Sequence, residues 1–254
     1  MKKLLLLCVA LASLMSLTAC ENLLIDTRDN QVYRIVTIGN QTWMAQNLNY
    51  RYDQQPKGDS SSYCYNNSAD SCAKYGRFYP RHAAFDIRGQ VPGNKPLDCS
   101  PLVSCNASGK IRGVCPDGWP LPSKAEWDTL FAVMGGPEAA AKKLRSTTGW
   151  NSMDNEGCGN GTDDSLFTVL PAGFDFIHYW DAPPEETLMS RTSSGQGAVA
   201  FFWSSTDIDS NKTDFVYFFA CHEKGMFNES EEISQLQQMA FFEREAFSVR
   251  CIKD

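Results

Sequence analysis

The clearest alternation of apolar and polar positions lies in residues 123–134 and predicts an amphipathic helix. Apolar side chains recur there at i, i+3, i+4 and i+7, starting from Trp127. Ser123 precedes this pattern and Glu126 stands three residues later, which is the spacing of a capping box. Two glycines follow the last apolar position and favour an end to the helix. A second helix is predicted over residues 138–145, with acid at its start and basic residues near its end.

Strand-like segments lie on either side of these helices. Residues 31–38 and 41–45 are separated by Gly39-Asn40, a dipeptide typical of a tight hairpin. Residues 78–85 fit either a strand or a short helix. Further strands are predicted over residues 165–170, 198–204, 214–220 and 247–251. Helices early and strands late predict an α+β fold with a mainly antiparallel sheet.

The segments between these elements are long and polar. Residues 51–62, 86–113 and 175–197 are predicted as loops, and residues 223–245 are acidic with a short helical pattern at 233–240. Irregular segments of this length are uncommon in a compact domain unless they are functional or cross-linked. We therefore expect the loops to carry either function or disulfides.

The N-terminus predicts export and lipid attachment. Lys2 and Lys3 precede an apolar segment that is too short to span a membrane as a mature helix. Leu17-Thr18-Ala19-Cys20 then resembles the processing site of bacterial lipoproteins, in which cleavage falls before a cysteine that receives a diacylglycerol. An ordinary secretory signal is the alternative. We expect a signal peptide at 1–19, a lipidated tether at 20–30 beginning with Cys20, and one domain over 31–254.

Charge narrows the range of partners. The formal net charge of −7 becomes −9 when removal of residues 1–19 takes away Lys2 and Lys3. This excess of negative charge argues against nucleic acid and anionic lipid headgroups as partners. The predicted contact with a membrane is therefore the lipid on Cys20, which places the protein in the bacterial cell envelope, at the outer membrane or cell surface.

The cysteines agree with an exported protein. Eight remain after Cys8 and Cys20 are set aside, and an even number in an exported chain suggests disulfides. They are Cys64, Cys72, Cys99, Cys105, Cys115, Cys158, Cys221 and Cys251. Sequence alone leaves many pairings open. The short spacings suggest Cys64–Cys72 and Cys99–Cys105 as local staples.

Motifs for metal binding or catalysis are lacking. Cys-x-x-Cys does not occur, and His82, His178 and His222 are far apart in the sequence. Residues 151–164 are rich in Asp and Asn but lack the spacing of a calcium loop. The signatures of serine hydrolases, zinc proteases and phosphate-binding loops are missing as well. The sequence therefore predicts no metal, no cofactor and no catalytic residue.

Aromatic residues beside carboxylates suggest a binding surface. Trp150, Asp175, Tyr179, Trp180 and Asp181 lie in or next to predicted polar loops. A flat ring with polar neighbours suits a sugar, which has an apolar face and hydroxyl edges. The alternative is that these rings pack beneath the loops as part of the core.

Several segments taken together resemble one family, the Fibrobacter succinogenes major paralogous domain. They are Ile38–Tyr50, Cys72–Arg77, Cys115–Trp127, Lys142–Trp150, Leu170–Phe174, Phe202–Thr206 and Phe247–Cys251. The match runs in order from about residue 30 to the end of the chain. The family is associated with exported surface proteins of a cellulose-degrading bacterium.

The resemblance implies a fold and a class of function. The family is thought similar to C-type lectin-like domains and to formylglycine-generating enzymes. Lectin-like folds join a helix region to the terminal strand by a disulfide, which implies a Cys115–Cys251 bridge and leaves Cys158 for Cys221. The implied function is a binding or adhesion module for plant cell-wall polysaccharide or another surface ligand. A structural envelope protein without a small ligand, or an enzyme related to the formylglycine-generating enzymes, is the alternative.

Overall fold

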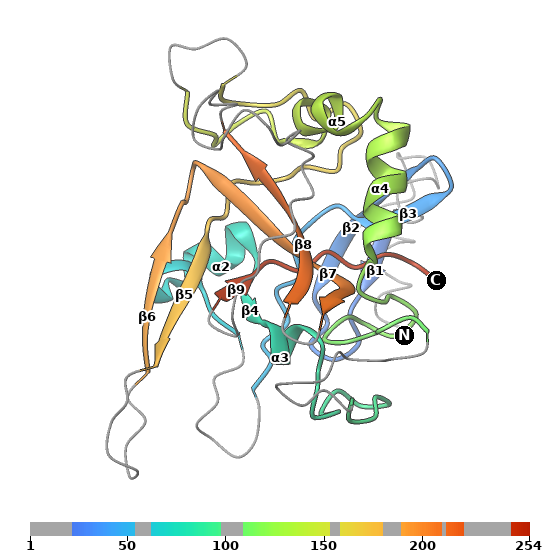
Figure 1. The fold of residues 1–254 in the computed structure, drawn as a ribbon, viewed down its shortest axis with the longest axis vertical. Helices are drawn as coiled ribbons and strands as arrows, with labels where there is room; N and C mark the ends of the chain where they lie inside the picture. Colours follow the sequence, from blue (N-terminus) through green and yellow to red (C-terminus); the bar gives the residue numbers. More distant parts are fainter. Residues whose placement is uncertain are drawn as a thin grey trace, which may run out of the picture.

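Short helices pack against small antiparallel sheets in this α+β protein (Figure 1). The computed structural model describes residues 22–53, 62–97, 109–152, 158–179, 189–209, 212–220 and 245–254. The N-terminal half contains β1 (Leu23–Ile25), β2 (Val32–Ile38), β3 (Gln41–Met44), η2 (Tyr65–Asn67), α2 (Ala69–Tyr75), β4 (Tyr79–Pro80), α3 (Arg81–Ala84) and α4 (Lys124–Val133). The C-terminal half contains α5 (Pro137–Leu144), β5 (Phe174–Tyr179), β6 (Met189–Ser194), β7 (Val199–Asp209), β8 (Lys212–Phe219) and β9 (Glu245–Phe247).

The first sheet has the order β1-β2-β3 and contains the predicted hairpin. Ile38 pairs with Gln41 across the turn, where Gly39 takes a φ of 58° that glycine adopts without strain. Strand β1 was not predicted, because residues 20–30 were expected to be a tether. The apolar run Leu23–Ile25 instead pairs with the free edge of β2. Residues 23–25 of the predicted tether are therefore part of the first sheet.

Helix α4 confirms the predicted helix and its capping box. The backbone N–H of Ser123 donates to Glu126 Oε2 at 2.7 Å, and the N–H of Glu126 donates to Ser123 Oγ at 3.3 Å. Trp127 is buried against Trp43 of β3, with ring centroids 4.7 Å apart. Helix α4 thus covers the hairpin, and α5 follows after the two glycines, as predicted.

The second sheet, of order β4-β9-β5-β6, joins distant parts of the chain. Strand β9 pairs with β4 through Phe247 and Tyr79, and with β5 through Ala246 and Asp175. The predicted loop at 175–197 is wrong, since β5 and β6 form an antiparallel hairpin there. Phe174 supports this hairpin because its ring packs against Phe201 of β7, at a centroid distance of 5.0 Å.

Strands β7 and β8 confirm the predicted strands at 198–204 and 214–220 and form a two-stranded ribbon. The predicted strand at 165–170 is wrong. Asp163, Leu166 and Thr168 all have positive φ, and the Asp163 carboxylate accepts from the Thr168 N–H and hydroxyl, both at 2.7 Å. The chain therefore curls around a side chain instead of extending. Only Val169 forms a β-bridge there, with Arg145.

The last predicted strand, 247–251, is wrong except at Phe247, because β9 begins earlier, at Glu245. Strand β9 ends at Phe247, and beyond it Ser248 and Ile252 form isolated bridges with Phe202 and Trp43. The predicted short helix at 233–240 lies outside the described residues. Across the part of the chain that the structure describes, no helix has the length and apolar character needed to cross a membrane.

The predicted loop at 86–113 is irregular in its described parts, 86–97 and 109–113. Its first part is organised by Asp86, which is 1% exposed. The Asp86 carboxylate accepts from the N–H groups of Gln90 and Val91 and from the side-chain amide of Asn94, at 2.8–2.9 Å. A buried carboxylate with several donors thus replaces regular secondary structure.

One short-range and one long-range disulfide cross-link the chain. Cys64 bonds to Cys72, and Cys115 bonds to Cys251 across a sequence separation of 136. The second pairing is the one that the family resemblance implied. Cys158 is disulfide-bonded as well. Its expected partner Cys221 lies outside the described residues, as does the expected pair Cys99–Cys105, so these pairings stay predictions.

Candidate functional site

A buried arginine ties together three segments at the centre of the molecule. Arg250, which is 1% exposed, donates from Nε to Asn47 Oδ1 at 2.7 Å. Its Nη1 donates to the carbonyls of Met44 and Phe167, at 3.1 and 2.6 Å, and its Nη2 to that of Thr168, at 2.9 Å. Burial lowers the pKa of Arg250 to about 9, so the guanidinium is charged at neutral pH. Its role in the described structure is to hold these segments in place.

A polar pocket of about 210 Å³ opens beside this network. It lies between β2, the segment after β3, the end of α2 and residues 168–170. Arg34 and Lys74 line it, and no carboxylate does so within the described residues. Because the chain as a whole carries an excess of acid, this lining is a local reversal of charge. Its electrostatic preference is for an anion.

A glycine shapes the wall of the pocket. Gly76 ends α2 with a φ of 77°, and a Cβ built on it would come within 2.7 Å of the Asn47 Cβ. Asn47 is itself fixed, because its amide donates to the Tyr75 carbonyl at 2.8 Å and accepts from Arg250. The close approach of α2 to the segment after β3 therefore requires glycine at position 76.

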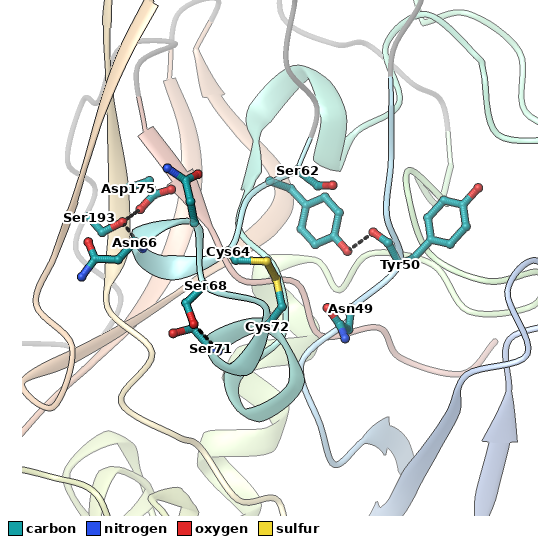
Figure 2. Close-up of a disulfide and its surroundings, with 12 residues drawn as sticks. Asn49, Tyr50, Ser62, Cys64, Asn66, Ser68, Ser71, Cys72, Asp175 and Ser193 are labelled. Carbon is teal, nitrogen blue, oxygen red and sulfur yellow. Dashed lines mark hydrogen bonds between the residues drawn. A yellow bond between two sulfur atoms is a disulfide. The ribbon is translucent and has the colours of Figure 1, made fainter.

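A second polar cluster lies where the β5–β6 hairpin meets the Cys64–Cys72 segment (Figure 2). Asp175 is fully buried and forms an ion pair with Arg191. Ser193 donates its hydroxyl to Asp175 Oδ1 at 2.5 Å and accepts from the Asn66 N–H at 2.8 Å. The Arg191 guanidinium also stacks over Tyr63, 3.8 Å from the ring centroid. These contacts fix the base of the hairpin to the body of the protein.

The surroundings of Asp175 have opposite effects on its pKa. Burial raises the pKa of this carboxyl, while the hydrogen bond from Ser193 and the charge of Arg191 act in the opposite direction. Desolvation is the largest of these effects, so the net pKa lies above the ordinary value. The ion pair with Arg191 therefore offsets only part of the desolvation cost of the Asp175 carboxylate, whose role is structural.

The disulfide segment is held by local bonds. Ser68 caps α2 by accepting from the Ser71 N–H at 3.4 Å, and Cys72 in the same helix bonds back to Cys64 (Figure 2). Between the cysteines, Asn66 has a φ of 50°. Asparagine tolerates this left-handed conformation. The turn brings the Asn66 N–H to Ser193 of β6.

Two of the predicted ligand-binding residues lie in the interior, which corrects their assignment. Trp150 is 4% exposed, and its indole N–H donates to Ser146 Oγ and to the Val169 carbonyl, both at 3.1 Å. Its ring face is therefore not available for stacking on a sugar. Asp175 is fully buried, and its oxygens are occupied by Arg191 and Ser193.

Of the other predicted ligand residues, Tyr179 lies within the described residues. Tyr179 is the last residue of β5 and lies opposite Met189 of β6. Trp180 and Asp181 follow it but lie outside the described residues, as does Cys20. The roles of these residues stay predictions. Within the part of the chain that the structure describes, no three potential metal ligands among His, Cys, Asp and Glu come together.

The sequence interpretation missed the pocket and the ion pair at the hairpin base. Asn47 and Arg250 stand within the quoted family segments, which was a signal for their importance but not for their contact. Lys74 also stands in such a segment, Cys72–Arg77, whereas Arg34 and Arg191 had no such signal. Each is an ordinary surface type of residue in sequence, and only the tertiary fold brings it to its site.

The fold and its sites define a disulfide-linked α+β domain with antiparallel sheets, a central buried arginine and a cationic pocket. The family model described as the Fibrobacter succinogenes major domain matches residues 36–253, and the chain belongs to that family. Comparison with the curated proteins gave no match. Comparison with the solved structures gave none either.

Proposed function

We propose that the protein is a lipid-anchored module of the bacterial cell surface that binds polysaccharide through its β5–β6 hairpin. The observation that supports this most directly is the braced base of the hairpin, where Asp175, Arg191 and Ser193 meet the disulfide segment. A binding loop presented on a fixed base loses less conformational entropy when it takes up a ligand.

The hairpin has the composition of a sugar-binding surface. Tyr179 ends β5, and Trp180 and Asp181 come directly after it. Strand β6 is the edge of its sheet and is rich in Ser and Thr, with Thr192 exposed. Hydroxyl side chains offer hydrogen bonds to sugar hydroxyls, and aromatic rings offer stacking. Plant cell-wall polysaccharide is the ligand class that we propose.

A C-type lectin-like fold is part of the same proposal. The long disulfide links the segment before α4 to the segment after β9, and the first and last parts of the chain meet at the bridge between Trp43 and Ile252. These features agree with a fold whose chain ends come together. The proposed location is the outer membrane or cell surface, and nucleic acid is not a proposed partner because the chain is acidic.

The ligand is tested by retention on insoluble cell-wall polysaccharide. Changing Tyr179 and Trp180 to Ala should weaken binding by about 1–3 kcal/mol per stacked ring. Tyr179→Phe with Trp180→Phe keeps two rings and serves as the matched control, which should retain most of the affinity. Intact binding by the double alanine variant, together with a lower unfolding midpoint, would place these rings in the core. Absence of any retention by the unchanged protein would favour a structural envelope role.

The anchor is tested separately. Cys20→Ser should abolish labelling by palmitate and release the protein from the membrane fraction, because the thiol that carries the lipid is gone. Cys8→Ser is the matched control, since Cys8 lies within the predicted signal peptide. Unchanged palmitate labelling of the Cys20→Ser variant would refute the lipoprotein assignment.

A further inference from the structure

An exposed apolar strip lies on the first sheet, close to the predicted lipid attachment site. Leu23, Ile25 and Val32 have exposed fractions of 44%, 37% and 49%. In the register of β1 and β2, Ile25 lies opposite Val32 and Leu23 opposite Arg34. Directly opposed residues point to the same side of an antiparallel pair. Leu23, Ile25, Val32 and Arg34 thus share one face, which we call the N-terminal face.

The chain leaves almost no slack between this face and Cys20. The carbonyl of Asn22 accepts from the Ile35 N–H at 3.0 Å, so the first described residue is already bonded to the sheet. Two residues of extended chain span at most about 7 Å. If Cys20 carries lipid, as the proposed function holds, Asn22 therefore lies within about 7 Å of the anchored residue by covalent reach alone.

Charge complements the apolar strip. Val32 and Arg34 of the N-terminal face also line the cationic pocket, together with Lys74. Among the described residues, neither Arg34 nor Lys74 forms an ion pair. A cationic recess with an apolar rim matches the order of groups in a phospholipid monolayer, in which phosphates lie above acyl chains.

We propose that the N-terminal face lies directly on the phospholipid surface that holds the anchor, with a headgroup phosphate in the pocket between Arg34 and Lys74. This inference rests on the proposed lipidation of Cys20. It revises the expectation from net charge, because the pocket lining carries Arg34 and Lys74 and no carboxylate among the described residues. Figure 1 draws β1 and the β5–β6 hairpin on opposite sides of the view.

The test measures the depth of two spin labels in the lipidated full-length mature protein. The protein is reconstituted into vesicles of phosphatidylethanolamine and phosphatidylglycerol, and its lipid is verified by mass. A label at Ile25→Cys should collide more with oxygen, which concentrates in the bilayer, than with a water-soluble nickel complex. A label at Thr192→Cys, on the exposed edge of β6, is the control and should show the opposite preference.

Side-chain variants then separate charge from apolar contact. Arg34→Gln and Lys74→Gln should each lower the ratio of docked to undocked molecules about fivefold, the equivalent of about 1 kcal/mol per cation near an anionic surface. Val32→Ser should also reduce docking. Val133→Ser removes a valine of similar exposure, 52%, from α4 and should leave docking unchanged.

The outcomes distinguish this inference from the proposed function. A water-exposed label at position 25 in verified lipidated protein overturns the docking and leaves the lipid anchor standing. Docking that is insensitive to both glutamine substitutions overturns the phosphate site. If mass shows that Cys20 carries no lipid, the anchor itself is refuted and the docking inference falls with it. Far-UV circular dichroism of each variant confirms that the fold is retained.

Discussion

Individual residues show how this protein accommodates buried charge. Arg250 is buried without a carboxylate among the atoms that it bonds, which is unusual because a buried cation is normally paired. Three backbone carbonyls and one amide oxygen replace the carboxylate. The rings of Phe167 and Phe202 add cation–π contacts at 4.7 and 5.7 Å. Arg250 therefore acts as a cross-brace whose geometry only a planar guanidinium can supply.

We expect Arg250→Gln to lower the free energy of unfolding by at least about 3 kcal/mol, because several buried acceptors lose a charged donor together. Arg250→Lys should fail to restore it, since an ammonium group cannot reach four acceptors spread over two segments. Urea unfolding monitored by tryptophan fluorescence gives both values. Arg51→Gln is the control, because the Arg51 side chain is 73% exposed and its removal should change stability by less than about 0.5 kcal/mol. Equal losses of stability from Arg250→Gln and Arg51→Gln would contradict the proposed structural role of Arg250.

Asp175 leads to a prediction about pH. Its pKa is raised in the folded protein, so the folded state binds more protons than the unfolded state at pH values just above the ordinary pKa of 3.8. The contribution of Asp175 to stability is therefore full at low pH and is lost as the pH rises through the folded pKa. The stability of wild type relative to Asp175→Asn should fall between about pH 4 and neutrality. Urea midpoints across this range provide the measurement, and a rise would show that Arg191 outweighs burial.

At the scale of elements, local rules identified some elements and missed others. The capping box, the helical spacing of α4 and the Gly39-Asn40 turn depend on neighbours within a few residues, so the sequence was sufficient for them. The β5–β6 hairpin depends on Asp175, Arg191 and Asn66, which are brought together only by the fold. Its second strand is polar and has no apolar alternation to reveal it. The pocket was not predicted for a related reason, since its lining residues come from separate segments that only the fold brings together.

Residues 165–170 show the converse error. Their composition favours a strand, but Asp163 binds the backbone and hydroxyl of Thr168 and bends the chain. Side chains of this type compete with regular structure by bonding to nearby backbone groups. The resulting turn presents the carbonyls of Phe167 and Thr168 to Arg250. A local side-chain bond and a distant arginine thus override strand propensity together.

The capping box of α4 can be tested within the helix itself. We expect Ser123→Ala to lower the free energy of unfolding by about 1 kcal/mol, because the Glu126 N–H loses its side-chain acceptor at the helix start. Glu126→Gln should cost less, since glutamine can also complete a capping box. Thr129→Ala, an exposed site in the same helix, is the control and should not destabilise. Urea unfolding midpoints decide, and equal losses at positions 123 and 129 would contradict the cap.

At the scale of the whole molecule, distant segments are joined by a few long-range connections. Aromatic packing is one of them, since Phe247 of β9 stacks on Phe201 of β7 at 5.0 Å and lies 4.6 Å from the ring of Trp203. The bridge between Trp43 and Ile252 is another, because it brings the first hairpin to the C-terminal segment. The family resemblance supplied the expectation of a disulfide between such distant parts, which spacing alone could not provide.

The two described disulfides should therefore differ in their effect on stability. In the chain-entropy model, the Cys115–Cys251 link, with a separation of 136, contributes about 5 kcal/mol, and Cys64–Cys72, with a separation of 8, about 2.5 kcal/mol. Replacing Cys115 and Cys251 by Ala should then remove much of the net stability of a domain, which is about 5–15 kcal/mol. Replacing Cys64 and Cys72 should leave a folded protein with a looser hairpin base. Urea unfolding of both double variants, with non-reducing peptide mapping of the parent, provides the test. A smaller loss from the long link than from the short one would show that native contacts, and not closure of the long loop, hold the chain ends together.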